Sequence, residues 1–117
     1  MTAPNDTNTI DREAVATKLD EARALIERGW TQHQYARGKG RRRARPNGKA
    51  ATCFCALGAL HKAYGIDDYD SSPAAAVLRQ VVGPIPQWND DPERTQTDVV
   101  EAFERAAAGV RSGEIAL

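Results

Sequence analysis

Apolar residues recur at helical spacing in four segments of the chain. The first segment has a stripe at intervals of four, three and four positions, made of Val15, Leu19, Ala22 and Ile26. Gly29 follows this stripe, where a left-handed C-cap needs a residue without a Cβ. Because Asp11 is a suitable N-cap residue, the pattern predicts a helix over about residues 12–28.

The second segment is rich in small residues and predicts a helix over residues 56–64, closed by Gly65. A glycine inside a helix costs about 1 kcal/mol relative to alanine. The glycine at position 58 therefore indicates that another part of the chain packs closely there. Trp30 and Trp88 are the neighbours that we expect for Gly58.

The third segment predicts a short, mostly buried helix with a clear start, since Ser72 can act as N-cap and Pro73 fits the first helical position. This helix is expected to end at Gly83. Residues 84–92 then contain three prolines and a tryptophan, and we predict an ordered loop there.

The fourth segment predicts the last helix, which begins near Thr95. This residue and Asp98 approximate a capping box, in which each side chain accepts a hydrogen bond from the backbone of the other residue. An apolar stripe follows at helical spacing. The helix is expected to end near Gly109 or Gly113.

Two extended pieces, residues 34–37 and 50–54, are predicted to pair as a small two-stranded hairpin. The predicted fold class is therefore mainly α, a compact bundle of about four short helices with this hairpin added. A length of 117 residues is typical of one domain. We expect a flexible N-terminal tail at 1–9, a single helical domain at 10–112 and a C-terminal tail at 113–117.

The overall composition is that of an ordinary globular protein, with 41% apolar and 27% charged residues. No apolar run approaches the roughly 18 residues that a membrane helix needs. The N-terminal segment also has no hydrophobic stretch of the kind found in secretory signals. We therefore expect a cytoplasmic protein without membrane contact, and the sequence leaves its oligomeric state open.

Charge is distributed unevenly, although the net charge is zero. Residues 37–49, which we call the basic loop, hold seven basic residues and no acid: Arg37, Lys39, Arg41, Arg42, Arg43, Arg45 and Lys49. The rest of the chain carries nine basic and all 16 acidic residues, a net charge of −7. Such a loop can be simply solvated, pair with the acidic segment at 67–70, or bind nucleic acid or an acidic protein.

Two thiols, Cys53 and Cys55, precede the second helix, whose N-terminus would stabilise a thiolate and lower its pKa. One hypothesis is a thiol-dependent hydrolase or transferase, with one of these thiols as nucleophile, His33 as base and Gln32 as oxyanion donor. The alternative is that both thiols are small buried apolar groups. These thiols together with His33 and His61 depart from the usual zinc-ligand spacing, so we expect no metal and no cofactor.

Three short motifs occur in order along the chain: Gly29-Trp30-x-Gln32, then Cys55-x-x-Gly58-Ala59-Leu60, then Trp88-Asn89-Asp90. In this order the chain resembles an uncharacterised small domain family of actinobacteria and their phages, over about residues 12–110. The resemblance implies a bacterial or phage origin and no particular activity. The positions that it singles out are Trp30, Gln32, Cys55, Gly58, Trp88, Asn89 and Asp90.

The leading hypothesis is a small binding or regulatory module of phage or bacterial type. Its motif residues would mainly build the fold, while the basic loop would engage a host or phage protein. The alternatives are nucleic-acid binding through the basic loop and the thiol-dependent enzyme. Enzymatic activity is the less expected of these, because the chain is poor in catalytic side chains and shows no paired carboxylates in an apolar setting.

Overall fold

The computed structural model describes residues 4–65 and 72–117. Within them the chain forms five α-helices and a two-stranded sheet, which confirms the mainly α fold predicted from the sequence. The helices are α1 (Pro4–Arg28), α2 (Ala56–Tyr64), α3 (Pro73–Val82), α4 (Ile85–Asn89) and α5 (Gln96–Ser112). The acidic segment at 67–70, a predicted partner of the basic loop, lies outside the described residues.

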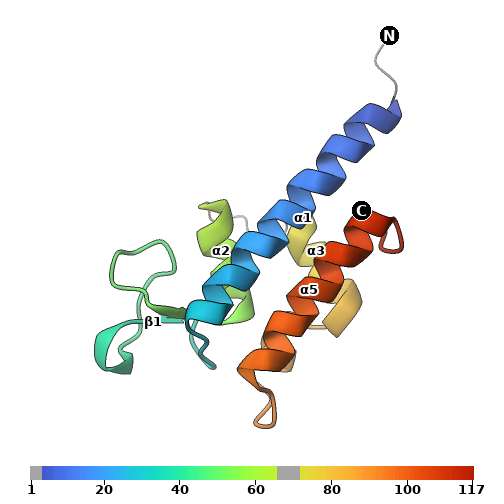
Figure 1. Cartoon of the computed structure of the whole chain (residues 1–117). Helices are drawn as coiled ribbons and strands as arrows, with labels where there is room; N and C mark the ends of the chain where they lie inside the picture. The colour runs from blue at the N-terminus through green and yellow to red at the C-terminus, as the bar shows by residue number, and fades with distance from the viewer. Residues whose placement is uncertain (1–3, 66–71) are drawn as a thin grey trace.

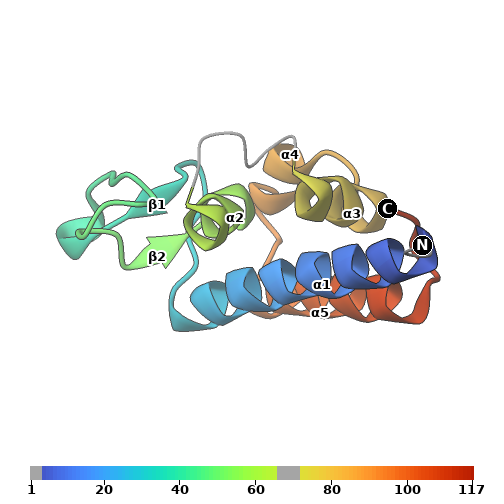
Figure 2. The same cartoon turned by 90° about the horizontal axis from the view of Figure 1, so that it is seen from above.

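The helices form two layers. In one layer α1 and α5 lie side by side and run in opposite directions, and α2, α3 and α4 cover one face of this pair (Figures 1 and 2). The core lies between the layers, where Leu19, Leu60, Leu78 and Phe103 are fully buried. Burial of each such side chain stabilises the fold by roughly 1.5–3 kcal/mol. The sheet and the basic loop project from one end of the helical layers (Figure 1).

The first helix is longer than the apolar pattern predicted. It begins at Pro4, so Asp11 lies inside it and does not cap it, and residues 4–9 of the predicted tail are helical. Proline is well suited to the first helical position, and no further proline or glycine occurs before Gly29. Although α1 has 25 residues, neither it nor any other described helix is apolar enough over a sufficient length to cross a bilayer.

Side-chain caps begin the third and fifth helices where the sequence predicted them. The Ser72 hydroxyl accepts a hydrogen bond from the Ala75 backbone N–H at 3.2 Å, ahead of α3. Thr95 and Asp98 form both bonds of a capping box at 3.1 Å, ahead of α5. Such a cap stabilises a helix by about 1 kcal/mol. The last helix ends at Gly113, whose φ is +86°.

The segment predicted as an ordered loop at 84–92 contains a short helix, α4 (Ile85–Asn89), so that prediction was wrong for these five residues. Its prolines begin the helix because Pro84 and Pro86 lie at the start, where a missing N–H costs no hydrogen bond. The Pro84 carbonyl accepts from the Trp88 N–H at 3.0 Å. The turn buries Ile85 and Asn89 on one side.

The predicted hairpin is present but shorter than expected. Strand β1 (Ala36–Arg37) pairs antiparallel with β2 (Cys53–Phe54), with Ala36 opposite Phe54 and Arg37 opposite Cys53. Trp30 also forms a parallel bridge to Phe54, so the chain leaving α1 runs along the other side of β2. The hairpin therefore connects the end of α1 to the start of α2.

Gly58 lies where the start of α2 contacts the strand segment before β1. A Cβ at this position would collide with the backbone carbonyl of Tyr35, which also accepts a hydrogen bond from the Cys55 N–H at 3.0 Å. Close packing at Gly58 was thus correctly predicted, but its neighbour was not. The three atoms nearest to a Cβ at Gly58 all belong to the Tyr35 backbone, and none belongs to Trp30 or Trp88.

Replacing Gly58 with alanine is expected to lower the free energy of unfolding by about 3 kcal/mol, since the backbone at Tyr35 cannot move aside as a side chain can. Gly109→Ala is the matched control, because a Cβ there would meet only the movable end of the Ile115 side chain. Its change should stay within about 1 kcal/mol. Urea denaturation of both variants tests the difference, and equal losses would contradict the packing described here.

Candidate functional site

The Asn89 side chain joins three segments of the chain that are far apart in sequence. It is 1% exposed, and its Oδ1 accepts hydrogen bonds from Trp30 Nε1 at 2.9 Å and from the Ala56 backbone N–H at 3.0 Å. Its Nδ2 donates to the Thr31 carbonyl at 3.2 Å and to Asp90 Oδ1 at 2.9 Å. The end of α4, the segment after α1 and the start of α2 therefore meet at one amide.

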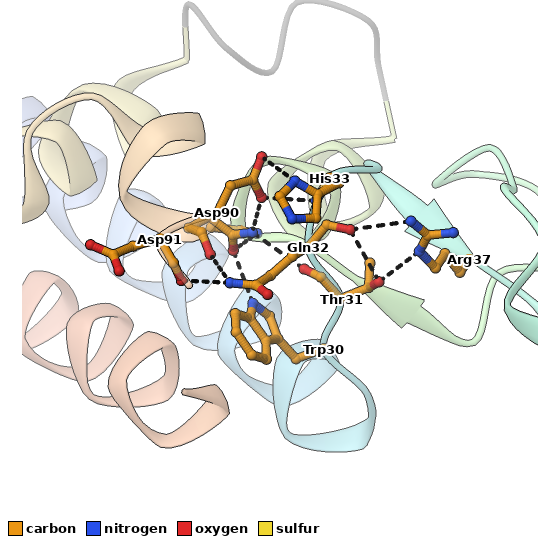
Figure 3. Close-up of polar contacts among 9 residues, drawn as sticks. Trp30, Thr31, Gln32, His33, Arg37, Asp90 and Asp91 are labelled. Carbon is orange, nitrogen blue, oxygen red and sulfur yellow. Dashed lines mark hydrogen bonds and ion pairs between the residues drawn. The ribbon is translucent and has the colours of Figure 1, made fainter. Parts of the chain in front are cut away.

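Gln32 holds the end of α4 through its main chain. Its Nε2 donates to the carbonyl oxygens of Asn89 at 3.0 Å and of Asp91 at 2.8 Å (Figure 3). Both amide hydrogens are thus used inside the fold, which leaves none for the oxyanion of a substrate. The hypothesis that Gln32 is an oxyanion donor has no support from this geometry.

His33 stands at the rim of this network in a strained backbone conformation. Its φ is +70°, a value that L-residues rarely adopt. The Asp90 carboxylate holds it, with Oδ1 accepting from the His33 backbone N–H at 2.9 Å and Oδ2 at 3.7 Å from Nδ1 (Figure 3). The His33 side chain is 68% exposed, so its imidazole faces solvent.

A cleft of about 260 Å³ opens beside this network. Leu57, Ile85 and Pro86 supply apolar walls, and three motif residues line it as well: Cys55, Asn89 and Asp90. His33 and Tyr35 also border the cleft. The other motif residues do not line it, so the motif divides into positions that border an open space and positions that build the fold.

The two thiols are not arranged for nucleophilic catalysis. Burial raises the pKa of Cys55 to about 11, although backbone N–H groups of Gly58 and Leu57 partly oppose this shift. Its sulfur caps α2 by accepting from the Gly58 N–H at 3.3 Å. The Cys53 Sγ lies 3.6 Å from the Arg37 carbonyl. In the described part of the chain neither thiol forms a hydrogen bond with His33.

Metal-binding side chains do not gather in the part of the chain that the structure describes. In residues 4–65 and 72–117, no three side chains of the types His, Cys, Asp and Glu lie close enough together to hold an ion. Cys53 and Cys55 belong to β2 and to the cap of α2, whereas His61 lies in the last turn of α2.

The basic loop has a defined backbone. The Gly38 N–H donates to the Arg42 carbonyl at 2.7 Å and the Ala44 N–H to the Ala36 carbonyl at 3.0 Å, and a 3-10 turn covers Lys39–Arg41. Pro46 is buried at its far side. The backbone of the loop is therefore folded onto the hairpin, while most of its charged side chains remain exposed to solvent.

Arg37 attaches the basic loop to the Asn89 network. Its Nε donates to Thr31 Oγ1 at 2.9 Å (Figure 3). Its Nη1 donates to the Arg41 carbonyl at 2.9 Å. Thr31 is buried, and its carbonyl accepts from Asn89 Nδ2. The Arg37 guanidinium therefore stabilises the fold of the loop itself.

The six other cations of the basic loop are exposed: Lys39, Arg41, Arg42, Arg43, Arg45 and Lys49. None of them forms an ion pair with an acidic side chain among the described residues. Several cations elsewhere in the described chain are paired, as in Arg23–Glu27 at 2.8 Å. The loop therefore presents uncompensated positive charge to solvent.

Sequence reasoning missed Thr31, the link of Arg37 to it, and Arg94. The Arg94 guanidinium lies 4.1 Å from the Trp88 ring centroid, and its Nε donates to the Trp88 carbonyl at 2.8 Å. Such a cation–π contact contributes about 0.5–1 kcal/mol at an exposed site. A basic residue six positions after a motif tryptophan was the available signal for this contact.

Comparison with protein families matches residues 11–109 to a family of unknown function (DUF6197). This agrees with the small domain family without assigned activity expected from the motif order, while the actinobacterial or phage origin stays a prediction. No curated protein and no solved structure matches the chain.

Replacing Asn89 with alanine is expected to lower the free energy of unfolding by about 3 kcal/mol, because the buried donors of Trp30 and Ala56 lose their acceptor. Gln87→Ala, an exposed amide on the same short helix, is the matched control and should change stability by less than about 0.5 kcal/mol. Urea denaturation measures both, and an Asn89→Ala loss as small as that of the control would contradict the network's role.

Cys55 is expected to react slowly with iodoacetamide at pH 8. With a pKa of about 11, roughly one molecule in a thousand carries the thiolate at that pH, and the rate should rise about tenfold per pH unit above it. A Cys53→Ser variant isolates the Cys55 signal, and the same variant in urea gives the rate of the unprotected thiol. Equal rates in the native and unfolded states at pH 8 would restore the nucleophile hypothesis.

Proposed function

Since the chain belongs to DUF6197, a family of unknown function, we propose its role from its own geometry: a small binding module that holds the phosphate backbone of a nucleic acid on its basic loop. The module would act in the cytoplasm of a bacterial cell, in keeping with the bacterial or phage origin that the motif order implies. The observation that carries this proposal is the set of six exposed, unpaired cations on a folded loop.

Like charges held close together repel one another. An anionic partner that neutralises them removes this repulsion and so lowers the free energy of the loop. Its backbone is already folded, through the Gly38–Arg42 and Ala44–Ala36 hydrogen bonds. Binding would therefore order mainly side chains and little backbone, which keeps the entropic cost low. These two properties support a binding function for the loop.

A nucleic acid fits the loop better than a protein does. Protein interfaces depend on aromatic and apolar residues buried at their centre. The large apolar residues exposed in the described part of the chain are Tyr35 and Leu117, and neither belongs to the loop. Phosphate binding needs only cations, and arginine, which supplies five of the seven here, binds phosphate through two parallel N–H groups.

The proposed binding is independent of sequence. Contacts to phosphates position a protein on a strand, whereas reading the bases requires an element that enters a groove. The helical part of the loop is the single 3-10 turn at Lys39–Arg41, which is too short for that purpose. The remainder of the chain, with its net charge of −7, would be repelled by the same phosphates, so the strand should contact the loop end of the molecule.

The test replaces Arg41, Arg42, Arg43 and Arg45 together with serine and measures binding to a short labelled duplex and a single strand by fluorescence anisotropy. Binding by the native chain should weaken steeply with salt, and the variant should lose most of its affinity, with a log–log salt slope smaller by about 0.9 per lost duplex contact. The matched control changes the same four residues to lysine, which keeps the charge and should retain binding.

A native chain that binds neither probe, or a serine variant that binds both as well as the native chain does, would overturn the proposal. Binding to an acidic protein in place of either nucleic acid would also overturn it, and would favour the protein-partner hypothesis. Circular dichroism of each variant verifies that its helices are intact.

A further inference from the structure

A second basic feature lies where the end of α1, the chain before β2 and the α2 helix meet. A cavity of about 420 Å³ opens there, within the size range of small-molecule sites. Three cations from separate segments line it: Arg28 of α1, Lys49 of the basic loop and Lys62 of α2. No carboxylate is among its lining residues in the described part of the chain.

We infer that this cavity binds a phosphate ester, either a phosphate of the strand on the basic loop or the phosphate of a free nucleotide. The first source deepens the proposed function, while the second is independent of it. Three cations from separate segments suit an oxyanion that accepts several hydrogen bonds at once. Thr52, with its side-chain hydroxyl, is a further polar lining residue, and Leu25 and Phe54 supply apolar surface for the rest of a nucleotide.

Among the residues that the structure describes, Arg28 forms no ion pair with the nearby acids of α1. Glu27, the acid nearest to Arg28 in the sequence, pairs with Arg23 at 2.8 Å, and Glu21 pairs with Lys18 at 3.2 Å. The end of α1 is also capped by other groups, since the carbonyl of Ile26 accepts from Gln96 Nε2 at 2.7 Å. Arg28 therefore remains available for a ligand.

The walls of the cavity are held in place before any ligand arrives. The Phe54 N–H donates to the Gly29 carbonyl at 3.0 Å, and the Phe54 carbonyl accepts from the Thr31 N–H at 3.1 Å. A Cβ at Gly29 would lie 2.6 Å from the Thr52 carbonyl oxygen, so the end of α1 approaches this strand as closely as a glycine allows. A preformed site loses little free energy in ordering its walls.

The experiment titrates the isotope-labelled protein with AMP, inorganic phosphate and adenosine, without any nucleic acid, and follows the backbone amide signals by NMR. AMP and phosphate should shift the signals of residues 48–52 and 62, and adenosine should not. Arg28→Gln and Lys62→Gln should each weaken AMP binding roughly tenfold, the loss expected for one charged hydrogen bond. Arg105→Gln removes one exposed cation from α5, outside the cavity lining, and should have no effect.

Adenosine binding as tightly as AMP, no response to AMP at all, or an equal loss in Arg105→Gln would overturn the inference. A further experiment separates the two sources with a duplex that has no terminal phosphates. Displacement of AMP by this duplex supports a phosphate of the strand backbone as the ligand. Unchanged AMP binding in the presence of bound duplex supports a free nucleotide. The four-serine loop variant should still bind AMP. AMP binding without duplex binding would thus contradict only the proposed function. Duplex binding without AMP binding would contradict only the inference that the cavity binds a phosphate ester.

Discussion

The arrangement of this domain depends on one buried amide. Burial of the Asn89 side chain is unfavourable by itself, since transfer of an amide out of water without new hydrogen bonds costs several kcal/mol. It keeps its place because both of its polar atoms find two partners each, supplied by three segments of the chain. A shift of any of these segments by one residue would leave a polar group unpaired. Asn89 therefore selects one relative position of α1, α2 and α4, where apolar contacts alone would tolerate several.

The surfaces proposed to bind a partner are attached to that same junction. Thr31 accepts from Arg37, which anchors the basic loop, and its carbonyl accepts from Asn89. Gly29, two residues earlier, lies against the strand that lines the cavity between α1 and α2. The motif residues thus act mainly as a frame, and the charged groups that could meet a partner stand at its edge.

Much of the fold could be predicted because its helix ends are encoded locally. Ser72, Gly65 and the pair Thr95 and Asp98 each act within four residues of their own position, so a single sequence suffices to recognise them. The start of α1 was missed because residues 5–11 show no apolar stripe that would predict a helix. The helix extends through them since they contain no proline or glycine to end it. The helix α4 was missed because prolines signal a loop as readily as the first turn of a helix.

The candidate site was harder to predict than the fold. The motif positions were found, but their contacts join residues 33 to 59 positions apart, and no periodic pattern connects such distant residues. The neighbour of Gly58 is a backbone carbonyl, which any residue at position 35 would supply, so the sequence carries no signal for it. The cavity lined by Arg28, Lys49 and Lys62 likewise exists only once three helical and loop segments have been brought together.

The basic loop, at one end of the molecule, carries a charge of +7, and the rest of the chain carries −7, so the molecule has an electric dipole moment (Figure 1). The electric field of a polyanion would orient the approaching molecule before contact, so that the basic loop faces the polyanion when the two meet. Orientation of this kind raises the association rate constant and leaves the dissociation rate constant nearly unchanged. The separation of charge along the chain is therefore also a kinetic property, and its influence fades as added salt shortens the distance over which the field acts.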